Sequence, residues 1–243
     1  MQTAGKNPSP ALVTPYQTLV QHFAAPSGKT YLLYGERSVF FLSLRMAAYG
    51  MAHGSSVAVV DGCNRFDVHY LSRFARERKL DVDDFLHRIF ISRGFTCYQM
   101  EQAIVHRLPL FLPTVDSRTA MIFGLLDTFY DQQASLREVR QILRRVLAAL
   151  GAMKGQGVSV LLACTQWNVM PKERNELFTT LRGGVDTVFR LEADGDNIPR
   201  LFLEKGVLND GPDGANLHQH YRQRAGELVE VPPRAPKGRP GAF

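Results

Sequence analysis

The central part of this chain alternates short apolar runs with longer amphipathic segments, and this alternation constrains the fold more than any other feature. The short runs have the length and composition of buried strands, at residues 31–34, 57–60, 89–92, 120–126 and 158–163. Between them, apolar residues recur at helical spacing, which predicts helices at 39–53, 67–79, 99–108 and 136–154. Strands that alternate with helices form parallel sheets with both faces covered, so the sequence predicts an α/β fold with a mostly parallel central sheet flanked by helices.

The pattern changes near the end of this region. Residues 187–192 and 200–205 alternate apolar and polar side chains, and the turn-forming tetrapeptide Asp-Gly-Asp-Asn lies between them at 194–197. Such alternation around a turn is typical of two antiparallel strands. The sequence therefore predicts a C-terminal antiparallel hairpin that follows the parallel strands.

Composition divides the chain into three parts. Residues 1–14 are rich in Pro, Gly and small polar residues and are predicted to be a flexible N-terminal segment. Residues 15–206 form the predicted core domain, which begins with a short amphipathic helix at 15–23. Residues 207–243 are dominated by polar residues, Gly and Pro, and are predicted to be a partly disordered C-terminal extension.

The overall composition limits the class of protein. Hydrophobic residues make up 45% of the chain and charged residues 21%, which is typical of a globular protein. No apolar run approaches the roughly 18 residues that span a membrane, so no membrane partner is expected. The three cysteines are widely spaced and no secretory signal is recognised, which favours a cytoplasmic location without a metal site. A net charge of +6 is compatible with an anionic partner such as nucleic acid.

Several strings along the chain occur in the order known from one protein family. They are VAVVDGCNRFDVHYLSRFARERKL at 57–80, IFISRGFTCYQMEQAI at 89–104, MIFGLLDT at 121–128 and GVSVLLACTQW at 157–167. Together with the strand spacing, these strings resemble the catalytic core of RecA and, more closely, of archaeal and eukaryotic RadA-type recombinases. The resemblance covers about residues 15–206 and implies a RecA-like core.

The resemblance implies a phosphate-binding loop after the first core strand, where backbone amides and a Lys hold the phosphates and a Ser or Thr holds Mg²⁺. Here that place contains Gly35, Arg37 and Ser38, and no Lys occurs between Lys29 and Lys79. The tempting Gly-Lys-Thr at 28–30 precedes the strand, so its amides cannot lie at the strand's carboxyl end. We interpret it as an ordinary turn.

The other catalytic positions are also altered. Relatives carry a general base, a Glu, two residues beyond the Asp that ends the second strand, but counting from Asp61 gives Cys63. A neutral thiol is a poor substitute for a carboxylate. Asp127 occupies the Walker B position, and Gln166 matches a polar sensor position after the fifth strand. Without a phosphate loop we favour a structural role for Asp127, as a hydrogen-bonding residue at a strand end.

Relatives bind DNA through two loops, after the fourth and fifth core strands. The first corresponding segment, residues 128–135, contains no Lys or Arg. The second segment and the helix after it supply the predicted DNA-binding residues, which are Trp167, Lys172, Arg174 and Arg182. Cations contact phosphates and aromatic rings stack on bases, which favours DNA binding. The alternative is a solvated loop with a half-buried Trp.

These observations lead to one main hypothesis and two alternatives. The main hypothesis is a non-catalytic RecA/RadA-like paralog without a cofactor, a pseudo-ATPase that acts in DNA recombination or repair. It would be a DNA-binding or scaffolding subunit, with a RecA/RadA-family partner or by self-association. The first alternative is an ATPase with an atypical loop of Gly35, Arg37 and Ser38, which uses ATP and holds Mg²⁺ through Asp127. The second is a structural adaptor that binds only protein.

Overall fold

The computed structural model describes residues 11–13, 27–165, 169–193 and 199–206, all of which belong to one unit that ends at Gly206. The predicted helix at 15–23 and the predicted C-terminal extension lie outside the described residues. No helix in the described part of the chain is both long enough and apolar enough to cross a membrane.

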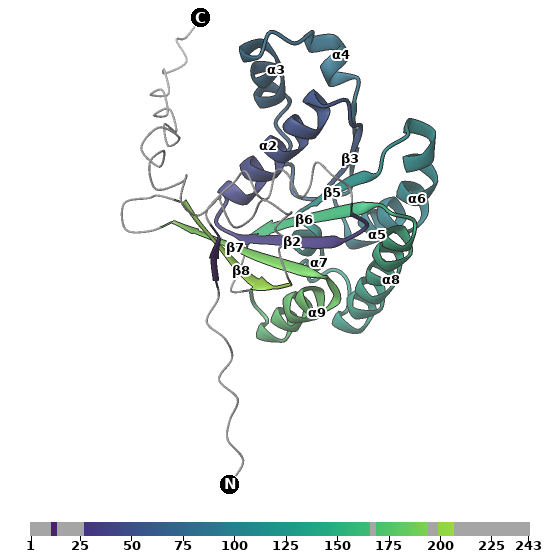
Figure 1. The fold of residues 1–243 in the computed structure, drawn as a ribbon. Helices are drawn as coiled ribbons and strands as arrows, with labels where there is room; N and C mark the ends of the chain where they lie inside the picture. The colour runs from purple at the N-terminus through teal and green to yellow at the C-terminus, as the bar shows by residue number, and fades with distance from the viewer. Residues whose placement is uncertain (1–10, 14–26, 166–168, 194–198, 207–243) are drawn as a thin grey trace, which may run out of the picture. The chain divides into compact units, whose positions relative to one another are not determined.

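Eight strands form one sheet in the order β1-β8-β7-β2-β6-β5-β3-β4 (Figure 1). The strands are β1 (Ala11–Val13), β2 (Thr30–Gly35), β3 (Val57–Asp61), β4 (Ile89–Arg93), β5 (Thr119–Phe123), β6 (Ser159–Thr165), β7 (Thr187–Ala193) and β8 (Pro199–Lys205). All pairs from β7 across to β4 are parallel, whereas β8 is antiparallel to both β7 and β1. The predicted α/β fold with a mostly parallel sheet and a C-terminal antiparallel hairpin is confirmed, and it is consistent with a RecA-like core.

Helices cover both faces of the sheet. They are α2 (Ser38–Ala52), α3 (Val68–Glu77), α4 (Val82–Leu86), α5 (Cys97–Glu101), the π-helix η1 (Gln102–Arg107), α6 (Leu108–Phe111), the 3₁₀ helix η2 (Leu112–Val115), α7 (Leu125–Phe129), α8 (Leu136–Gly155), the 3₁₀ helix η3 (Lys172–Asn175) and α9 (Glu176–Gly184). Figure 1 shows α2 and α3 on one side of the sheet and α5, α8 and α9 on the other.

The side chains of each strand point alternately to the two faces of the sheet, and both faces are packed against helices. Leu32 of β2 belongs to the buried cluster that includes Ile142 of α8, whereas the ring of Phe123 of β5 contacts Phe40 of α2. Successive side chains of a strand point to opposite faces, so a strand covered on both faces must be apolar at nearly every position. This is why the strands appear in the sequence as continuous apolar runs.

The N-terminal strand was not predicted. Ala11–Val13 lie within the segment expected to be a flexible lead-in, but they form β1 and pair with Leu201, Phe202 and Leu203 of β8. A strand at the edge of a sheet exposes unpaired backbone groups, and an added strand satisfies them. Three residues carry too little pattern for this pairing to be recognised from sequence.

The predicted helix at 99–108 begins earlier and ends later than expected. Its N-cap is Thr96, whose side chain accepts a hydrogen bond from the backbone N–H of Gln99. The helix passes through a π-helical turn and continues to Phe111. Pro109 lies just beyond this turn and has no backbone N–H, so the bond it would make within a regular α-helix is missing.

The fourth core strand is shorter than predicted. It ends at Phe123 rather than at 126, because Gly124 adopts a left-handed conformation with φ 62° and ψ 36°. A Cβ at Gly124 would lie 2.3 Å from the Cβ of Cys63, so only glycine fits here. The chain turns at once into α7, and the prediction that Asp127 lies at a strand end is wrong. Asp127 lies in the first turn of α7.

Candidate functional site

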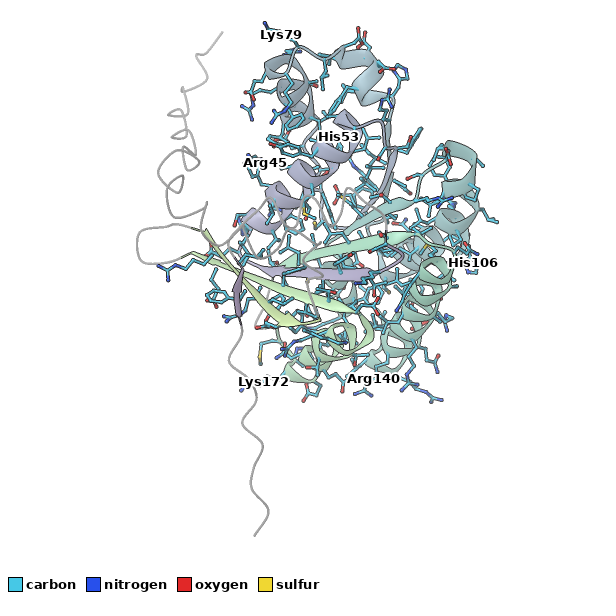
Figure 2. The ribbon with its side chains drawn as sticks, viewed as in Figure 1. Arg45, His53, Lys79, His106, Arg140 and Lys172 are labelled. Carbon is cyan, nitrogen blue, oxygen red and sulfur yellow. The ribbon has the colours of Figure 1, made fainter. Side chains whose placement is uncertain are left out.

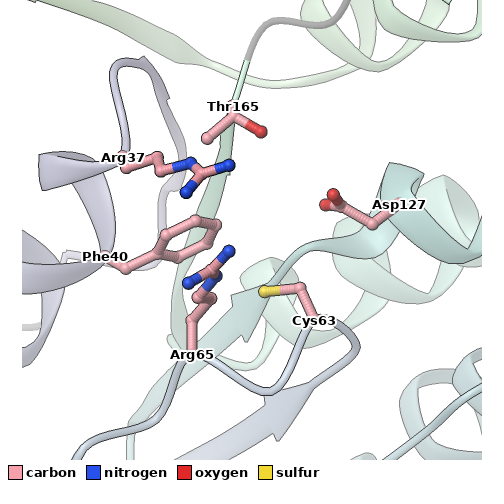
Figure 3. Close-up of a pocket in the computed structure, with 6 residues that line it drawn as sticks. All are labelled: Arg37, Phe40, Cys63, Arg65, Asp127 and Thr165. Atoms are coloured by element: carbon pink, nitrogen blue, oxygen red, sulfur yellow. The ribbon is translucent and has the colours of Figure 1, made fainter. Parts of the chain in front are cut away.

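A pocket of about 200 Å³ lies at the edge of the sheet where the parallel strands end. Thr165 ends β6 and pairs in register with Gly35, the last residue of β2. The residues that line the pocket come from the carboxyl ends of strands and from the segments that follow them; they are Arg37, Phe40, Cys63, Arg65, Asp127 and Thr165 (Figure 3). In open α/β sheets, ligands bind at this edge.

Asp61 does not line the pocket, but it holds the loop that carries two of the lining residues. Asp61 is 1% exposed, and its carboxylate accepts hydrogen bonds from the backbone N–H groups of Cys63 (3.1 Å), Arg65 (3.2 Å) and Phe66 (3.0 Å). A carboxylate that accepts several backbone bonds holds a loop in one conformation. Asp61 therefore positions both Cys63 and Arg65 at the pocket.

The connection from β2 to α2 contains only Glu36 and Arg37. Gly35 has φ 130°, and a Cβ there would lie 2.0 Å from the carbonyl oxygen of Leu191. The N–H of Glu36 donates to that same oxygen (3.2 Å), and the N–H of Val39 donates to the carbonyl of Glu36 (2.9 Å). The amides of Glu36 and Val39 are thus used within the fold. They do not form the concave array of free N–H groups that surrounds bound phosphates in phosphate-loop proteins.

Two polar atoms at the pocket are buried and lack partners. Oγ1 of Thr165 and Oδ2 of Asp127 make no hydrogen bond to any described residue, and Thr165 is only 9% exposed. Burial raises the pKa of Asp127, and Asp61 adds to the rise, whereas Arg65 opposes it. Buried polar atoms are normally hydrogen-bonded, so these two atoms are available to a ligand.

The pocket carries two cations and one thiol. Arg37 and Arg65 form no ion pair within the described part of the chain. Figure 3 shows their guanidinium groups on one side of the pocket and the Asp127 carboxylate on the other. Burial, followed by the charges of Asp61 and Asp127, raises the pKa of the Cys63 thiol. Cys63 therefore stays protonated and can act neither as a base nor as an activated nucleophile.

The structure brings three of the predicted site residues together, namely Arg37, Cys63 and Asp127. Gly35 and Ser38 lie beside the pocket in sequence but do not line it, and Gln166 lies outside the described residues.

Sequence reasoning did not assign Phe40, Arg65 and Thr165 to this site, although all three line the pocket. A usable signal existed for two of them, because Arg65 and Thr165 lie at or just after strand ends, and parallel strands end at a common edge.

The surroundings of Arg174 argue against the predicted DNA contact. Arg174 is 4% exposed, and its guanidinium donates to the carbonyl oxygens of Phe129 (2.6 Å) and Ala134 (2.5 Å). These bonds tie η3 to the last residue of α7 and to the segment that follows it. Arginine has five donors in a fixed planar group, which suits it to satisfy buried carbonyl groups.

The remaining predicted DNA contacts differ in their surroundings. Arg182 forms an ion pair with Glu204 (3.1 Å). Lys172 is exposed on the outer surface near α9 (Figure 2). Trp167 lies outside the described residues. A cation committed to a neighbouring carboxylate gains less from a phosphate, so among the described residues Lys172 is the best placed of the predicted contacts.

The residues present do not fit the Mg²⁺ that the family resemblance implies. Asp127 is the only carboxylate among the residues that line the pocket, and Arg37 and Arg65 would repel a divalent cation there. The described part of the chain holds no group of three or more His, Cys, Asp or Glu residues that could bind a metal ion.

Comparison with known proteins adds no family assignment. The sequence matches no protein-family model, and it matches no curated protein at a significant level.

Proposed function

We propose that this protein is a non-hydrolysing RecA/RadA-like paralog that acts as a DNA-binding or scaffolding subunit in DNA recombination or repair. The observation that carries the proposal is the connection between β2 and α2, in which Glu36 and Arg37 alone link the strand to the helix. The sheet and its helices are consistent with a RecA-like core, while the loop that would hold phosphates is replaced by a tight turn.

Three features oppose ATP hydrolysis at this site. Phosphoryl transfer depends on a positioned triphosphate, a metal ion that neutralises charge and a group that orients the attacking water. Here the amides of Glu36 and Val39 bond within the fold, two arginines oppose a metal ion, and a protonated Cys63 replaces the base. An ATPase with an atypical loop is the less favoured alternative for these reasons.

The part of the proposal that concerns DNA depends on fewer residues than the sequence suggested. Arg174 is committed to backbone carbonyls and Arg182 to Glu204, which leaves Lys172 as the described candidate for a phosphate contact. The same two commitments favour the second candidate function, a structural adaptor that binds only protein.

ATP turnover tests whether the protein hydrolyses nucleotide. Phosphate release from ATP with Mg²⁺ is measured for the full chain and for Asp127→Ala, with and without single-stranded DNA. We expect no release that depends on Asp127. Turnover by the wild-type chain that disappears in Asp127→Ala would refute the proposal and support the ATPase.

DNA binding is tested by its salt dependence. If Lys172 contacts a phosphate, Lys172→Ala weakens binding uniformly across sequences and reduces the slope of log affinity against log salt by about one. The matched control is Arg73→Ala, which removes an exposed cation from α3. If the wild-type chain shows no salt-dependent binding, the protein-only adaptor replaces the DNA-binding reading.

A further inference from the structure

The geometry points to the pocket at the strand ends as a binding site for a small phosphate monoester, held by the side chains of Arg37, Arg65 and Thr165 without a metal ion. This inference goes beyond the proposed function and does not depend on it. It concerns a ligand that is bound by side chains, whereas a phosphate loop binds nucleotides mainly through backbone amides.

The charges in the pocket match a phosphate group. Arg37 and Arg65 together carry two positive charges, have no ion-pair partner among the described residues and face Asp127 across the pocket (Figure 3). A phosphate monoester carries a charge of about −1.5 to −2 at neutral pH and offers three acceptor oxygens. Guanidinium groups bind such oxygens in pairs, so one phosphate can satisfy both arginines.

The two unpartnered oxygens specify the rest of the ligand. The Thr165 hydroxyl is buried, has no partner among the described residues and can donate to a phosphate oxygen. The free Oδ2 of Asp127 lies opposite the arginines and, when ionised, needs a donor rather than a second acceptor. A ligand with a phosphate at one end and a hydroxyl group at the other satisfies both atoms. The ester is therefore that of a polyhydroxylated alcohol.

The volume of the pocket limits how many carbon atoms the alcohol part of the ligand can have. This volume of about 200 Å³ is smaller than the roughly 300–1,000 Å³ of sites for drug-sized ligands. The ring of Phe40 supplies an apolar wall for a short carbon chain. A phosphate with a few carbon atoms suits this space, whereas a triphosphate chelated to Mg²⁺ would also bring a divalent cation against two arginines.

Calorimetric titration of the full chain tests the site with defined probes. The probes are glycerol 3-phosphate, inorganic phosphate, glycerol and ATP, each in EDTA and then in Mg²⁺. We expect glycerol 3-phosphate to bind in EDTA, inorganic phosphate to bind more weakly and glycerol not to bind, and we expect Mg²⁺ to strengthen none of these. The inference is overturned if neither glycerol 3-phosphate nor phosphate binds, or if only ATP binds and requires Mg²⁺.

Variants test whether the named side chains hold the ligand. Arg37→Gln and Arg65→Gln are each expected to weaken glycerol 3-phosphate binding by about tenfold or more, because each removes charge-assisted hydrogen bonds. Thr165→Val is expected to weaken it by roughly two- to tenfold. Arg73→Gln is the matched control and leaves the affinity unchanged. Circular dichroism confirms that each variant is folded, and equal effects of Arg73→Gln and the pocket variants would overturn the inference.

Asp127→Asn distinguishes this site from a metal-dependent nucleotide site, because the two kinds of site predict opposite changes in ligand affinity. Removal of a negative charge from the pocket is expected to strengthen the binding of inorganic phosphate severalfold. A site that binds nucleotide through Mg²⁺ loses affinity in the same variant, and that result would overturn the inference. The proposed function fails on a different readout, Asp127-dependent ATP turnover, so each of the two proposals can fail while the other stands.

Discussion

Replacement of Arg174 by Ala is expected to lower the free energy of unfolding substantially. The guanidinium makes two short bonds, to the carbonyl oxygens of Phe129 and Ala134, in a side chain that is 4% exposed. A hydrogen bond to a charged group contributes about 1.5–3 kcal/mol, and each carbonyl left unsatisfied costs about 1–3 kcal/mol. Water that enters the space left by the side chain recovers part of this loss. We therefore expect a net loss of about 3 kcal/mol.

Two further variants separate this role from a general effect of charge. Lys172→Ala removes an exposed cation two residues away in the same 3₁₀ helix, and the expected change is within about 0.5 kcal/mol. Arg174→Lys keeps the charge, but one ammonium group cannot reproduce the planar fork that reaches both carbonyls. Its stability is expected to lie between those of Arg174→Ala and the wild type.

Urea unfolding of the full chain, followed by circular dichroism, measures all three variants. The reasoning is refuted if Arg174→Ala loses no more stability than Lys172→Ala. The comparison also affects DNA-binding experiments, because any loss of binding in Arg174→Ala would reflect a damaged fold rather than a missing phosphate contact.

Three more substitutions around the pocket are expected to change stability, each measured by the same urea unfolding. Gly124→Ala is expected to lower the free energy of unfolding by about 2 kcal/mol or more, because it combines a left-handed backbone with a clash at Cys63. Its control, Gly151→Ala on the open face of α8, is expected to raise it by about 0.5–1 kcal/mol. Equal effects at the two glycines would contradict this reasoning. Asp61→Ala is expected to lower the free energy of unfolding by about 2–4 kcal/mol, because it leaves three backbone N–H groups without their acceptor. A loss below about 1 kcal/mol would contradict this and show that water replaces the carboxylate. Burial raises the pKa of Asp127 in the folded protein, so its contribution to stability is full below its unfolded pKa and is lost as the pH rises through the folded pKa. The free energy of unfolding of Asp127→Asn relative to the wild type should therefore rise as the pH increases above the unfolded pKa of about 4, and a difference that does not change with pH would contradict the raised pKa.

The sheet could be predicted because its information is local. Each core strand is a short apolar run, and each intervening helix has a clear period, so both are visible in windows of a few residues. The end of β5 could not be predicted in this way. Gly124 leaves the extended conformation where the loop after β3 brings Cys63 within contact, and that approach exists only in the folded chain.

The candidate site was only partly predictable for the same reason. Arg37, Cys63 and Asp127 were found because the family resemblance draws attention to their positions. Arg65 and Thr165 were missed although their positions after and at strand ends were visible, whereas Phe40 lies within α2 and is placed at the pocket only by the packing of that helix on the sheet.

The burial of Arg174 could not be predicted from the sequence. A basic residue in a polar segment is typical of an exposed loop, and only the tertiary structure supplies the two carbonyl groups that it satisfies.

A crystal structure of the full chain grown with ATP and Mg²⁺ tests most directly whether the strand-end site has lost its phosphate loop. We expect the N–H of Glu36 to remain bonded to the carbonyl of Leu191, with no triphosphate across the connection and no metal ion at Asp127. A triphosphate held by the backbone amides of residues 35–38, with Mg²⁺ beside Asp127, would contradict the proposal and identify a working nucleotide site.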